Sequence, residues 1–400
     1  MEENEILHEI DPEGDIDLIL CSPNPPLPFA VWNEDQDQTA PMSSSKPAEP
    51  TSKKRKHSTA FGNDLSFYDS LDQGIDNESQ PHHTPVEPTI SDAPTQPCEE
   101  ETTVGDAPDQ PGEEEPAVGA QDCQGTMHRF RLSSKHLTMA SAYFKKMLQG
   151  PWKESNASTL EAFDWDPDAM VILMNIIHGR HRKVPRTVDL EMFAKIAIIA
   201  DYYDCHEPVE VFAKRWIKQV KDTVPIEYCR ELILMLAVCC VFPVTGISRS
   251  MVRYAMRYST GPLQTMDLPI PQHVTDAIEE RRQELVDKII GRLHDLVFYF
   301  SDVRTKCSFD CSSLLLGALT KQLREHGLLA PSPTKPFLGY SVCGLIDIVR
   351  SFVSPKLFEG APAFGLKTRC SCRLGDFTKE MIKDAQDEVR LMDVATLLDK

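Results

Sequence analysis

Between about residues 34 and 125, this 400-residue chain is rich in Pro, Ser, Thr, Gln, Asp and Glu. Apolar side chains occur there only as isolated positions such as Phe61, Leu65 and Phe67. Such a segment buries too little surface to offset the entropy of ordering its backbone, roughly 1–2 kcal/mol per residue. We therefore expect 34–125 to be a disordered insert, with the folded part assembled from the residues on either side of it.

The charge of the chain follows the same division. Residues 1–126 contain 28 Asp and Glu against 5 Lys and Arg, whereas residues 127–400 contain 33 against 37, so the net charge of −19 belongs to the N-terminal third. This asymmetry is typical of an acidic insert on a nearly neutral globular body. Because net negative charge repels a phosphate backbone, we expect no direct binding of nucleic acid.

The hydropathy pattern predicts no contact with a membrane. The longest apolar run, Leu232 to Val244, has 13 residues. That is too short to cross a hydrocarbon core about 30 Å thick and fits a buried helix. No signal-peptide pattern is present at the N-terminus, so we expect the protein to stay inside the cell.

Periodicity predicts a small sheet and many short helices. Strands are expected at 15–20, 128–132 and 160–163, with a short apolar segment at 29–32. Helices are expected to run from Ser133 or Ser134 to 148, from Asp166 or Asp168 to 179, and over 190–203, 209–220, 226–241, 248–258, 274–300, 312–326, 341–352 and the last twenty residues. The predicted fold class is α+β, followed by an all-helical C-terminal region.

Four segments carry a family resemblance. Asp15 to Leu20 resembles the first strand of the BTB/POZ fold, and Phe130 to Phe144 resembles its second strand and the helix after it. Met170 to Gly179 and Ala200 to Cys205 resemble later helix ends of the family, in the family's order. The resemblance covers about 115 residues and implies a BTB/POZ fold with the insert inside it.

The resemblance divides the chain into five parts. These are a flexible tail at 1–12, a discontinuous BTB/POZ domain at 13–33 and 126–220, the disordered acidic insert at 34–125, a helical domain at 221–330, and a C-terminal segment at 331–400. The helices after 225 resemble the C-terminal region of BTB proteins of filamentous fungi. Joining the first two strands through the insert costs about 1–2 kcal/mol in loop closure, which is tolerable.

The family implies a non-enzymatic scaffold or adaptor that binds protein partners and forms a homodimer. The dimer surface would involve the first strand and the first helix, so the candidates are Ile16, Leu18, Leu137, Met139 and Phe144. Many members pair a strand-one Asp with a His in a charged pocket. Asp15 is present here, but Ser133 stands where the His would be, so ligands of that pocket do not carry over.

A second implied partner is a cullin-type ubiquitin ligase, for which the chain would be a substrate receptor. Family members that recruit a cullin contact it through a hydrophobic–x–Glu triplet at this place, here Trp152-Lys-Glu154. The alternative is that Trp152 caps the local core.

A basic cluster lies within the acidic insert. Lys53, Lys54, Arg55 and Lys56 are consecutive, and such exposed basic clusters are recognised as nuclear import signals. The alternative is a patch that neutralises its acidic surroundings. Import would place the protein in the nucleus, or in nucleus and cytoplasm, where a third role is regulation of transcription or chromatin through the acidic insert.

Two cysteine pairs, Cys307 with Cys311 and Cys370 with Cys372, could supply four thiolates to a zinc ion. Their spacing is not the common C-x2-C, so structural thiols without metal are the simpler expectation, and no other cofactor is expected. The chain has no G-x-S-x-G, Walker, G-x-G-x-x-G or H-E-x-x-H motif, so we expect no enzymatic activity.

Overall fold

The computed structural model describes residues 5–23, 28–33, 125–149, 158–302, 308–355 and 372–391. Nearly all of the expected disordered insert therefore lies outside the described residues. So do the predicted import signal at 53–56, Trp152 and Glu154, and the cysteines Cys307 and Cys370.

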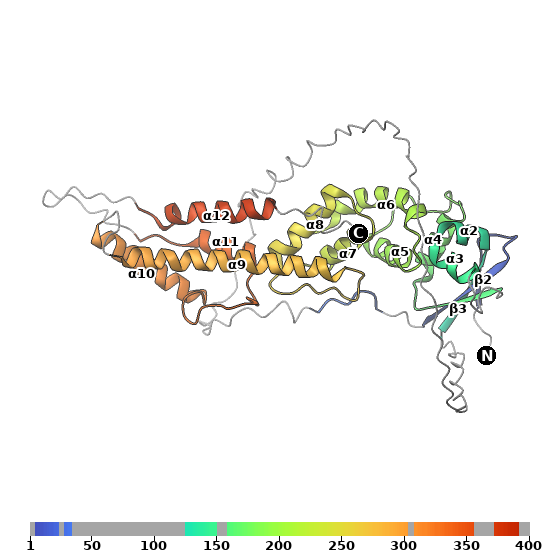
Figure 1. Ribbon diagram of the computed structural model, residues 1–400, viewed down its shortest axis with the longest axis horizontal. Coiled ribbons are helices and arrows are strands. Elements are labelled where there is room, and N and C mark those ends of the chain that lie inside the picture. Colours follow the sequence, from blue (N-terminus) through green and yellow to red (C-terminus); the bar gives the residue numbers. More distant parts are fainter. Residues whose placement is uncertain are drawn as a thin grey trace, which may run out of the picture. The chain divides into compact units, whose positions relative to one another are not determined.

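A four-stranded sheet with strand order β1-β3-β2-β4 forms one end of the fold (Figure 1). Antiparallel pairing joins β2 to β3, while β1 runs parallel to β3 and β4 parallel to β2. Ile16 lies opposite Leu132 and Leu18 opposite Phe130. The expected pairing across the insert is thereby confirmed. The strands are β1 Glu5–Glu9, β2 Ile16–Pro23, β3 Gly125–Leu132 and β4 Thr159–Phe163.

Alternation along β2 separates the two faces of the sheet. Ile16, Leu18 and Leu20 are buried, whereas Asp17 and Ile19 between them are only partly covered. Successive side chains of a strand point to opposite faces, so the buried set lines the face that meets the helices. A shift of one residue in the pairing of β2 would turn all three buried side chains toward solvent.

The prediction of a flexible tail at 1–12 is wrong for residues 5–9, which form β1. The strand is held by its parallel pairing to β3, by an ion pair between Glu5 and Arg129, and by stacking of His8 on Phe130 at a ring distance of 4.6 Å. The hydropathy pattern did not predict β1, because three of its five residues are polar. An edge strand can be held mainly by its backbone hydrogen bonds and needs little apolar surface.

Five helices accompany the sheet. They are α2 Ser134–Ala140, α3 Ala142–Gln149, α4 Pro167–Ile177, α5 Leu190–Tyr202 and α6 His206–Val220. Asp166 and Asp189 cap α4 and α5, because their carboxylates accept hydrogen bonds from the Ala169 and Met192 amides. The BTB-type succession of short strands and helices expected from the sequence is confirmed.

Ser141 divides the single helix expected from Ser134 to Leu148 into α2 and α3. Its backbone is extended, its hydroxyl donates to the Tyr203 carbonyl, and the same oxygen accepts from the Phe144 amide. This local side-chain bonding replaces the helical backbone pattern, as serine often does at helix starts.

The C-terminal region is helical, and α10, α11 and α12 all contact the long helix α9 (Figure 1). Its elements are the 3-10 turn η4 Lys221–Thr223, then α7 Arg230–Val241, α8 Thr245–Tyr258, α9 Gln272–Ser301, α10 Phe309–Glu325, α11 Val342–Ser351 and α12 Leu374–Arg390. The last helix starts earlier than the expected final twenty residues, of which 392–400 lie outside the described part.

Helix α7 connects the two halves of the fold. All of its residues from Leu232 to Val241 are buried, and it packs against α5 on one side and α8 on the other. A helix that is apolar all round belongs in an interior. The expected boundary near 220 is consequently not a break in the core, since one continuous set of buried side chains runs through both halves.

Arg282 in α9 has a fully buried side chain. Its guanidinium donates to both carboxylate oxygens of Glu279, at 2.8 and 2.6 Å. It also donates to the carbonyls of Pro336, Phe337 and Tyr340, at 2.6, 3.2 and 2.8 Å. All five of its N–H groups have acceptors, so the arginine fastens the loop before α11 to α9.

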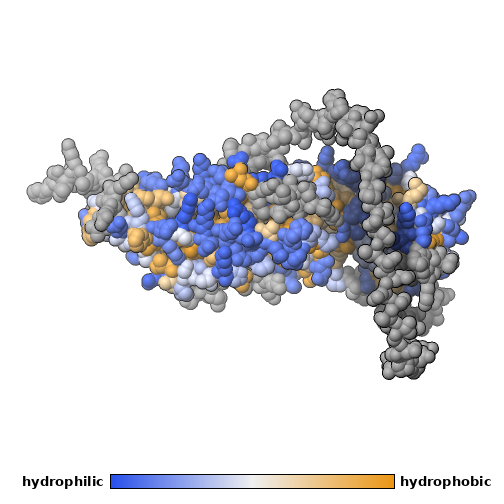
Figure 2. All heavy atoms as spheres, in the orientation of Figure 1, coloured by the Kyte–Doolittle hydropathy of each residue, from blue (hydrophilic) through white to orange (hydrophobic). Residues whose placement is uncertain are grey.

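Hydrophilic side chains cover most of the visible surface, and hydrophobic ones gather there only in small groups (Figure 2). Among the described residues, no helix combines the length and the apolar character that a membrane span needs.

Candidate interaction surfaces

Four of the five residues expected at a dimer surface belong to the core. Ile16, Leu18, Leu137 and Phe144 are buried within the single chain, so they have no surface to offer a partner. Leu18 packs between strands, and the Phe144 ring stacks on Tyr203 at 4.7 Å. These four, which the family resemblance suggested and among which core residues were expected, lie on the inner face of the sheet and helices, and the dimer surface itself stays a prediction. The fifth, Met139, is 87% exposed.

Asp15 is occupied by the protein itself. Its carboxylate accepts hydrogen bonds from the Ser134 amide at 2.8 Å and the Ser134 hydroxyl at 2.6 Å. These bonds, with the hydroxyl making the largest contribution, lower the pKa of Asp15 below its ordinary value. The interaction resembles a helix cap across 119 residues of sequence, since Ser134 begins α2.

His178 lies beside Ser133, the position at which many BTB/POZ proteins carry a histidine and this chain does not. Its Nε2 accepts from the Ser133 amide at 2.9 Å, and its ring lies 5.0 Å from that of His136 on α2. Burial lowers the pKa of His178, and the neighbouring His136 lowers it further. The residue was missed because it follows α4 in sequence and reaches α2 only through the fold.

The exposed apolar side chains nearest this histidine form a candidate partner surface. Met139 projects from α2, while Ile6 and Leu7, which point to opposite faces of β1, are 45% and 60% exposed. His178 has a neighbour from each side, His136 on α2 and Asp11 just after β1. We name Ile6, Leu7, His136 and Met139 the β1–α2 surface.

A histidine pair holds β1 to β3. His8 Nε2 lies 3.0 Å from His128 Nδ1, and the rings stack with centroids 5.3 Å apart. Burial lowers both pKa values, and His128 lowers that of His8 further, while the carboxylate of Asp168 acts in the opposite direction on both. One hydrogen bond between two neutral rings is therefore the favoured state near neutral pH.

We expect stability to fall as the solution is acidified below about pH 6.5. The folded pKa values of His8, His128 and His178 lie below the ordinary histidine value of about 6.5, so the unfolded chain binds protons at a pH where the folded chain does not. The stabilisation is complete above pH 6.5 and is lost as pH falls through the folded values. Urea unfolding at pH 7.5 and 5.5 measures this. A His8→Asn/His128→Asn variant should show a smaller loss, and an equal loss would contradict the assignment.

Aromatic rings from three elements gather where α3 and α5 meet. Tyr143 lies 5.5 Å from Tyr202, which lies 5.2 Å from Trp165 in the loop before α4. Tyr202 is 53% exposed, whereas Tyr203 beneath it is buried, and burial raises the pKa of Tyr203. We name Tyr143, Trp165 and Tyr202 the aromatic surface. Such amphipathic rings are enriched at protein interfaces.

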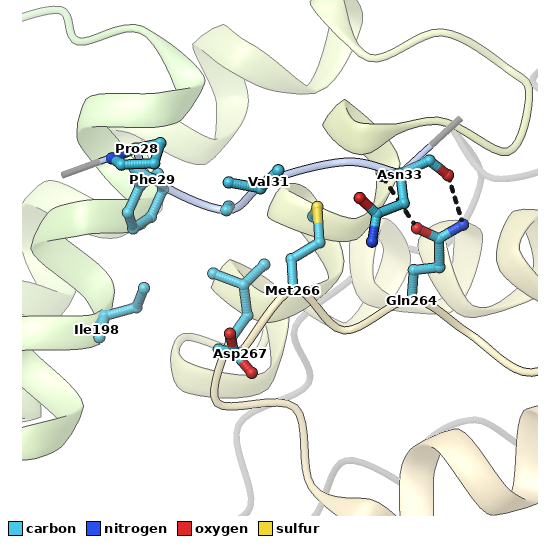
Figure 3. Close-up of a pocket in the computed structure, with 10 residues that line it drawn as sticks. Pro28, Phe29, Val31, Asn33, Ile198, Gln264, Met266 and Asp267 are labelled. Carbon is cyan, nitrogen blue, oxygen red and sulfur yellow. Dashed lines mark hydrogen bonds between the residues drawn. The ribbon is translucent and has the colours of Figure 1, made fainter. Parts of the chain in front are cut away.

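Residues 28–33 are held firmly where the chain enters the insert. Arg230 on α7 donates to the carbonyls of Phe29 and Ala30, each at 2.9 Å, and pairs with Glu191 at 2.9 Å. Gln264 exchanges two hydrogen bonds with the Asn33 backbone, at 3.3 and 3.2 Å (Figure 3). The short apolar segment expected at 29–32 is thus a clamped loop.

This clamped loop forms one wall of a cavity of about 530 Å³, opposite Ile198 and the loop from Gln264 to Leu268 (Figure 3). Three of its lining residues, Ala30, Met266 and Asp267, have positive φ angles of 48°, 54° and 59°. Backbone in this region is strained for residues other than glycine and persists where surrounding contacts hold it.

Replacing Arg230 with alanine should release the clamp. The change removes three charge-assisted hydrogen bonds, and we expect a loss of about 1.5–3 kcal/mol in the free energy of unfolding with faster amide exchange at 28–33. Lys214→Ala is the control. Its ion pair with Glu210 is exposed on both sides, so about 0–0.5 kcal/mol is expected. Unchanged exchange at 28–33 would argue against the clamp.

The zinc prediction is untested by the described residues. Cys311 is buried in the first turn of α10, and Cys372 is partly buried just before α12, while their expected co-ligands Cys307 and Cys370 lie outside. Within the ranges that the structure describes, no group of three or more His, Cys, Asp or Glu is arranged to hold a metal ion.

A small sheet in which β2 and β3 form an antiparallel pair, followed by short helices, is the arrangement expected for a BTB/POZ-type interaction domain. Comparison with family models agrees: residues 122–219 match the BTB/POZ domain. The chain thus contains a BTB/POZ domain, and a role as a protein-interaction adaptor follows from it. No curated protein and no solved structure matches the chain. The resemblance of the later helices to filamentous-fungal proteins stays a prediction.

The family match starts at residue 122, just before β3. Strand β2, on the far side of the insert, supplies the strand between β3 and β4. The sheet is therefore assembled from segments on both sides of the insert.

Proposed function

We propose that this protein is an adaptor that self-associates through the β1–α2 surface and presents other faces to its partners. The supporting observation is the exposure of Met139, Leu7 and Ile6, which place three large apolar side chains of α2 and β1 in water. Exposed apolar groups of this kind are typical of surfaces that a partner covers. β1 is also an edge strand of the sheet, a position at which a strand of another chain can add to the sheet.

The test is the molar mass of the full chain in solution, measured by light scattering after size exclusion. Wild type should elute as a dimer at micromolar concentration, and Leu7→Asp/Met139→Asp should elute as a monomer, because two buried carboxylates would oppose association. Phe298→Asp is the control, since Phe298 is 76% exposed on α9, away from this surface. A monomeric wild type, or a dimer that survives the double substitution, would contradict the proposal.

A second proposal is recruitment of a cullin-type ubiquitin ligase. It is supported by the aromatic surface, to which α3 contributes Tyr143 shortly before the Trp152-Lys-Glu154 triplet in sequence. Pull-down of a cullin from cell extract should be lost with Glu154→Ala and with Tyr202→Ala. Recovery that is equal for wild type and both variants, or absent for wild type, would remove this role.

A third proposal concerns location. Four consecutive cations at 53–56 within an acidic neighbourhood support nuclear import, which would allow a role in transcription or chromatin regulation. Replacing Lys53, Lys54, Arg55 and Lys56 with alanine should shift a fluorescent fusion from nucleus to cytoplasm. An unchanged distribution would eliminate the import signal.

A further inference from the structure

The loop between α4 and α5 concentrates positive charge on a folded body whose charges are otherwise nearly balanced. From Gly179 to Val188 it contains four Lys and Arg residues and no Asp or Glu, against a net charge of −19 for the whole chain. Three of these cations, Arg182, Lys183 and Arg186, have exposed side chains.

The loop is fastened in place at several points. Arg180 donates to the Glu9 carbonyl at 2.8 Å, and the Trp216 indole donates to the Pro185 carbonyl at 3.2 Å. The His181 ring lies 5.2 Å from Phe212, and Val184 is buried. The cations consequently project from a fixed backbone, which reduces the entropy lost when a ligand binds them.

Helix α6 extends this positive region. Phe212 and Trp216 touch the loop, and Arg215 lies three positions after Phe212, so it sits on the helix face beside the loop. Lys218 follows one turn later and is also exposed. We define the basic surface as Arg182, Lys183, Arg186, Arg215 and Lys218.

None of these five cations has an ion-pair partner among the residues that the structure describes. The neighbouring lysines differ: Lys214 pairs with Glu210, and Lys221 pairs with Asp222. Like charges held close together repel each other, and an incoming anion relieves that repulsion. The basic surface is therefore complementary to a ligand that carries several negative charges.

One apolar side chain lies among the cations. Val211 on α6 is 76% exposed and precedes Arg215 by four positions and Lys218 by seven, which puts the three on one stripe of the helix. A phosphate backbone gains nothing from an exposed valine. An acidic peptide segment that also carries an apolar side chain would use both features.

Carboxylates border the surface as well. Asp189 caps α5 three residues after Arg186, and Glu210 on α6 immediately precedes Val211 and pairs with Lys214. A duplex carries a phosphate charge about every 1.7 Å along its axis and would be brought against these carboxylates. A single peptide strand is narrow enough to contact the cations alone.

We propose that the basic surface, together with Val211, docks an acidic peptide segment of a partner protein in which glutamate or aspartate flanks an apolar residue. This surface is separate from the β1–α2 surface, so the proposal stands whether or not the protein self-associates. The five cations would bind the acidic side chains of the peptide. The contact with Val211 would fix which peptide residue lies at which position on the surface.

Binding of a fluorescein-labelled peptide of repeated Glu-Glu-Leu triplets to the full chain tests this, by anisotropy at about 25 and 300 mM salt. The peptide should bind at low salt and weaken as salt rises. Arg182→Glu/Lys183→Glu/Arg215→Glu should weaken it roughly tenfold or more. Val211→Ala should weaken it about threefold, but should leave binding of a matched Glu-Glu-Ala peptide unchanged.

The matched control is Lys145→Glu/Lys146→Glu/Lys321→Glu. It changes the net charge equally at exposed positions on α3 and α10, and should bind the peptide within about twofold of wild type. Thermal unfolding monitored by circular dichroism establishes that both triple variants are folded. No binding by wild type, equal weakening by both triple variants, or no effect of Val211→Ala would overturn the proposal. So would tight, surface-dependent binding of a short DNA duplex with no binding of the peptide.

Discussion

Replacing Arg282 with alanine is expected to lower the free energy of unfolding by about 3–5 kcal/mol, the range typical of breaking a buried ion pair by removing one partner. The change leaves the mostly buried Glu279 carboxylate without its counterion and the carbonyls of Pro336, Phe337 and Tyr340 without that donor. Urea unfolding followed by circular dichroism measures the loss.

Two further variants separate the geometry of this arginine from its charge. Arg282→Lys keeps the charge but has a single ammonium group in place of the planar fork, so it should recover less than half of the loss. Arg281→Ala removes the preceding arginine, whose ion pairs with Glu284 and Glu388 are partly exposed, and should cost about 0–1 kcal/mol. Similar losses for Arg281→Ala and Arg282→Ala would show that burial is not the cause.

Truncating Leu18 to alanine is expected to cost about 2–5 kcal/mol. Leu18 sits in the central strand β2, opposite Phe130 on one side and Leu160 on the other, and is fully buried. Both neighbours lie beyond the insert in sequence. A loss of this size in the full chain would demonstrate that the pieces on the two sides of the insert fold together.

Ile19 provides the control for this prediction. It is adjacent in sequence and similar in size, but it points to the opposite, less covered face of the sheet. Ile19→Ala should therefore cost clearly less than Leu18→Ala, about 1 kcal/mol. If the two substitutions cost the same, the assigned register of β2 would be contradicted.

The strands and helices of the fold were largely predictable from sequence because their periods are local. Leu18, Leu20, Phe130 and Leu132 alternate as a half-buried sheet requires, and Asp166 and Asp189 mark helix starts. The break at Ser141 was not, since it depends on a hydrogen bond to Tyr203, 62 residues away.

The candidate surfaces were harder to predict, because they depend on contacts between segments that are remote in sequence. The family resemblance pointed to the first helix and so to Leu137 and Phe144, which are buried, whereas a partner surface needs residues that depart from the apolar period. His178 and the Arg230 clamp join segments remote in sequence, and no pattern within a single segment encodes them.

The place of β2 in the strand order determines how this protein can be divided. Because β2 lies between β3 and β4, a polypeptide limited to the family-matched residues 122–219 would lack the middle of its sheet, leaving two strands with no bridge between them. It would also lose α7, which covers α5. Such a fragment should collect in inclusion bodies, while a chain that keeps residues 5–33 and runs through α12 should melt in a single cooperative transition.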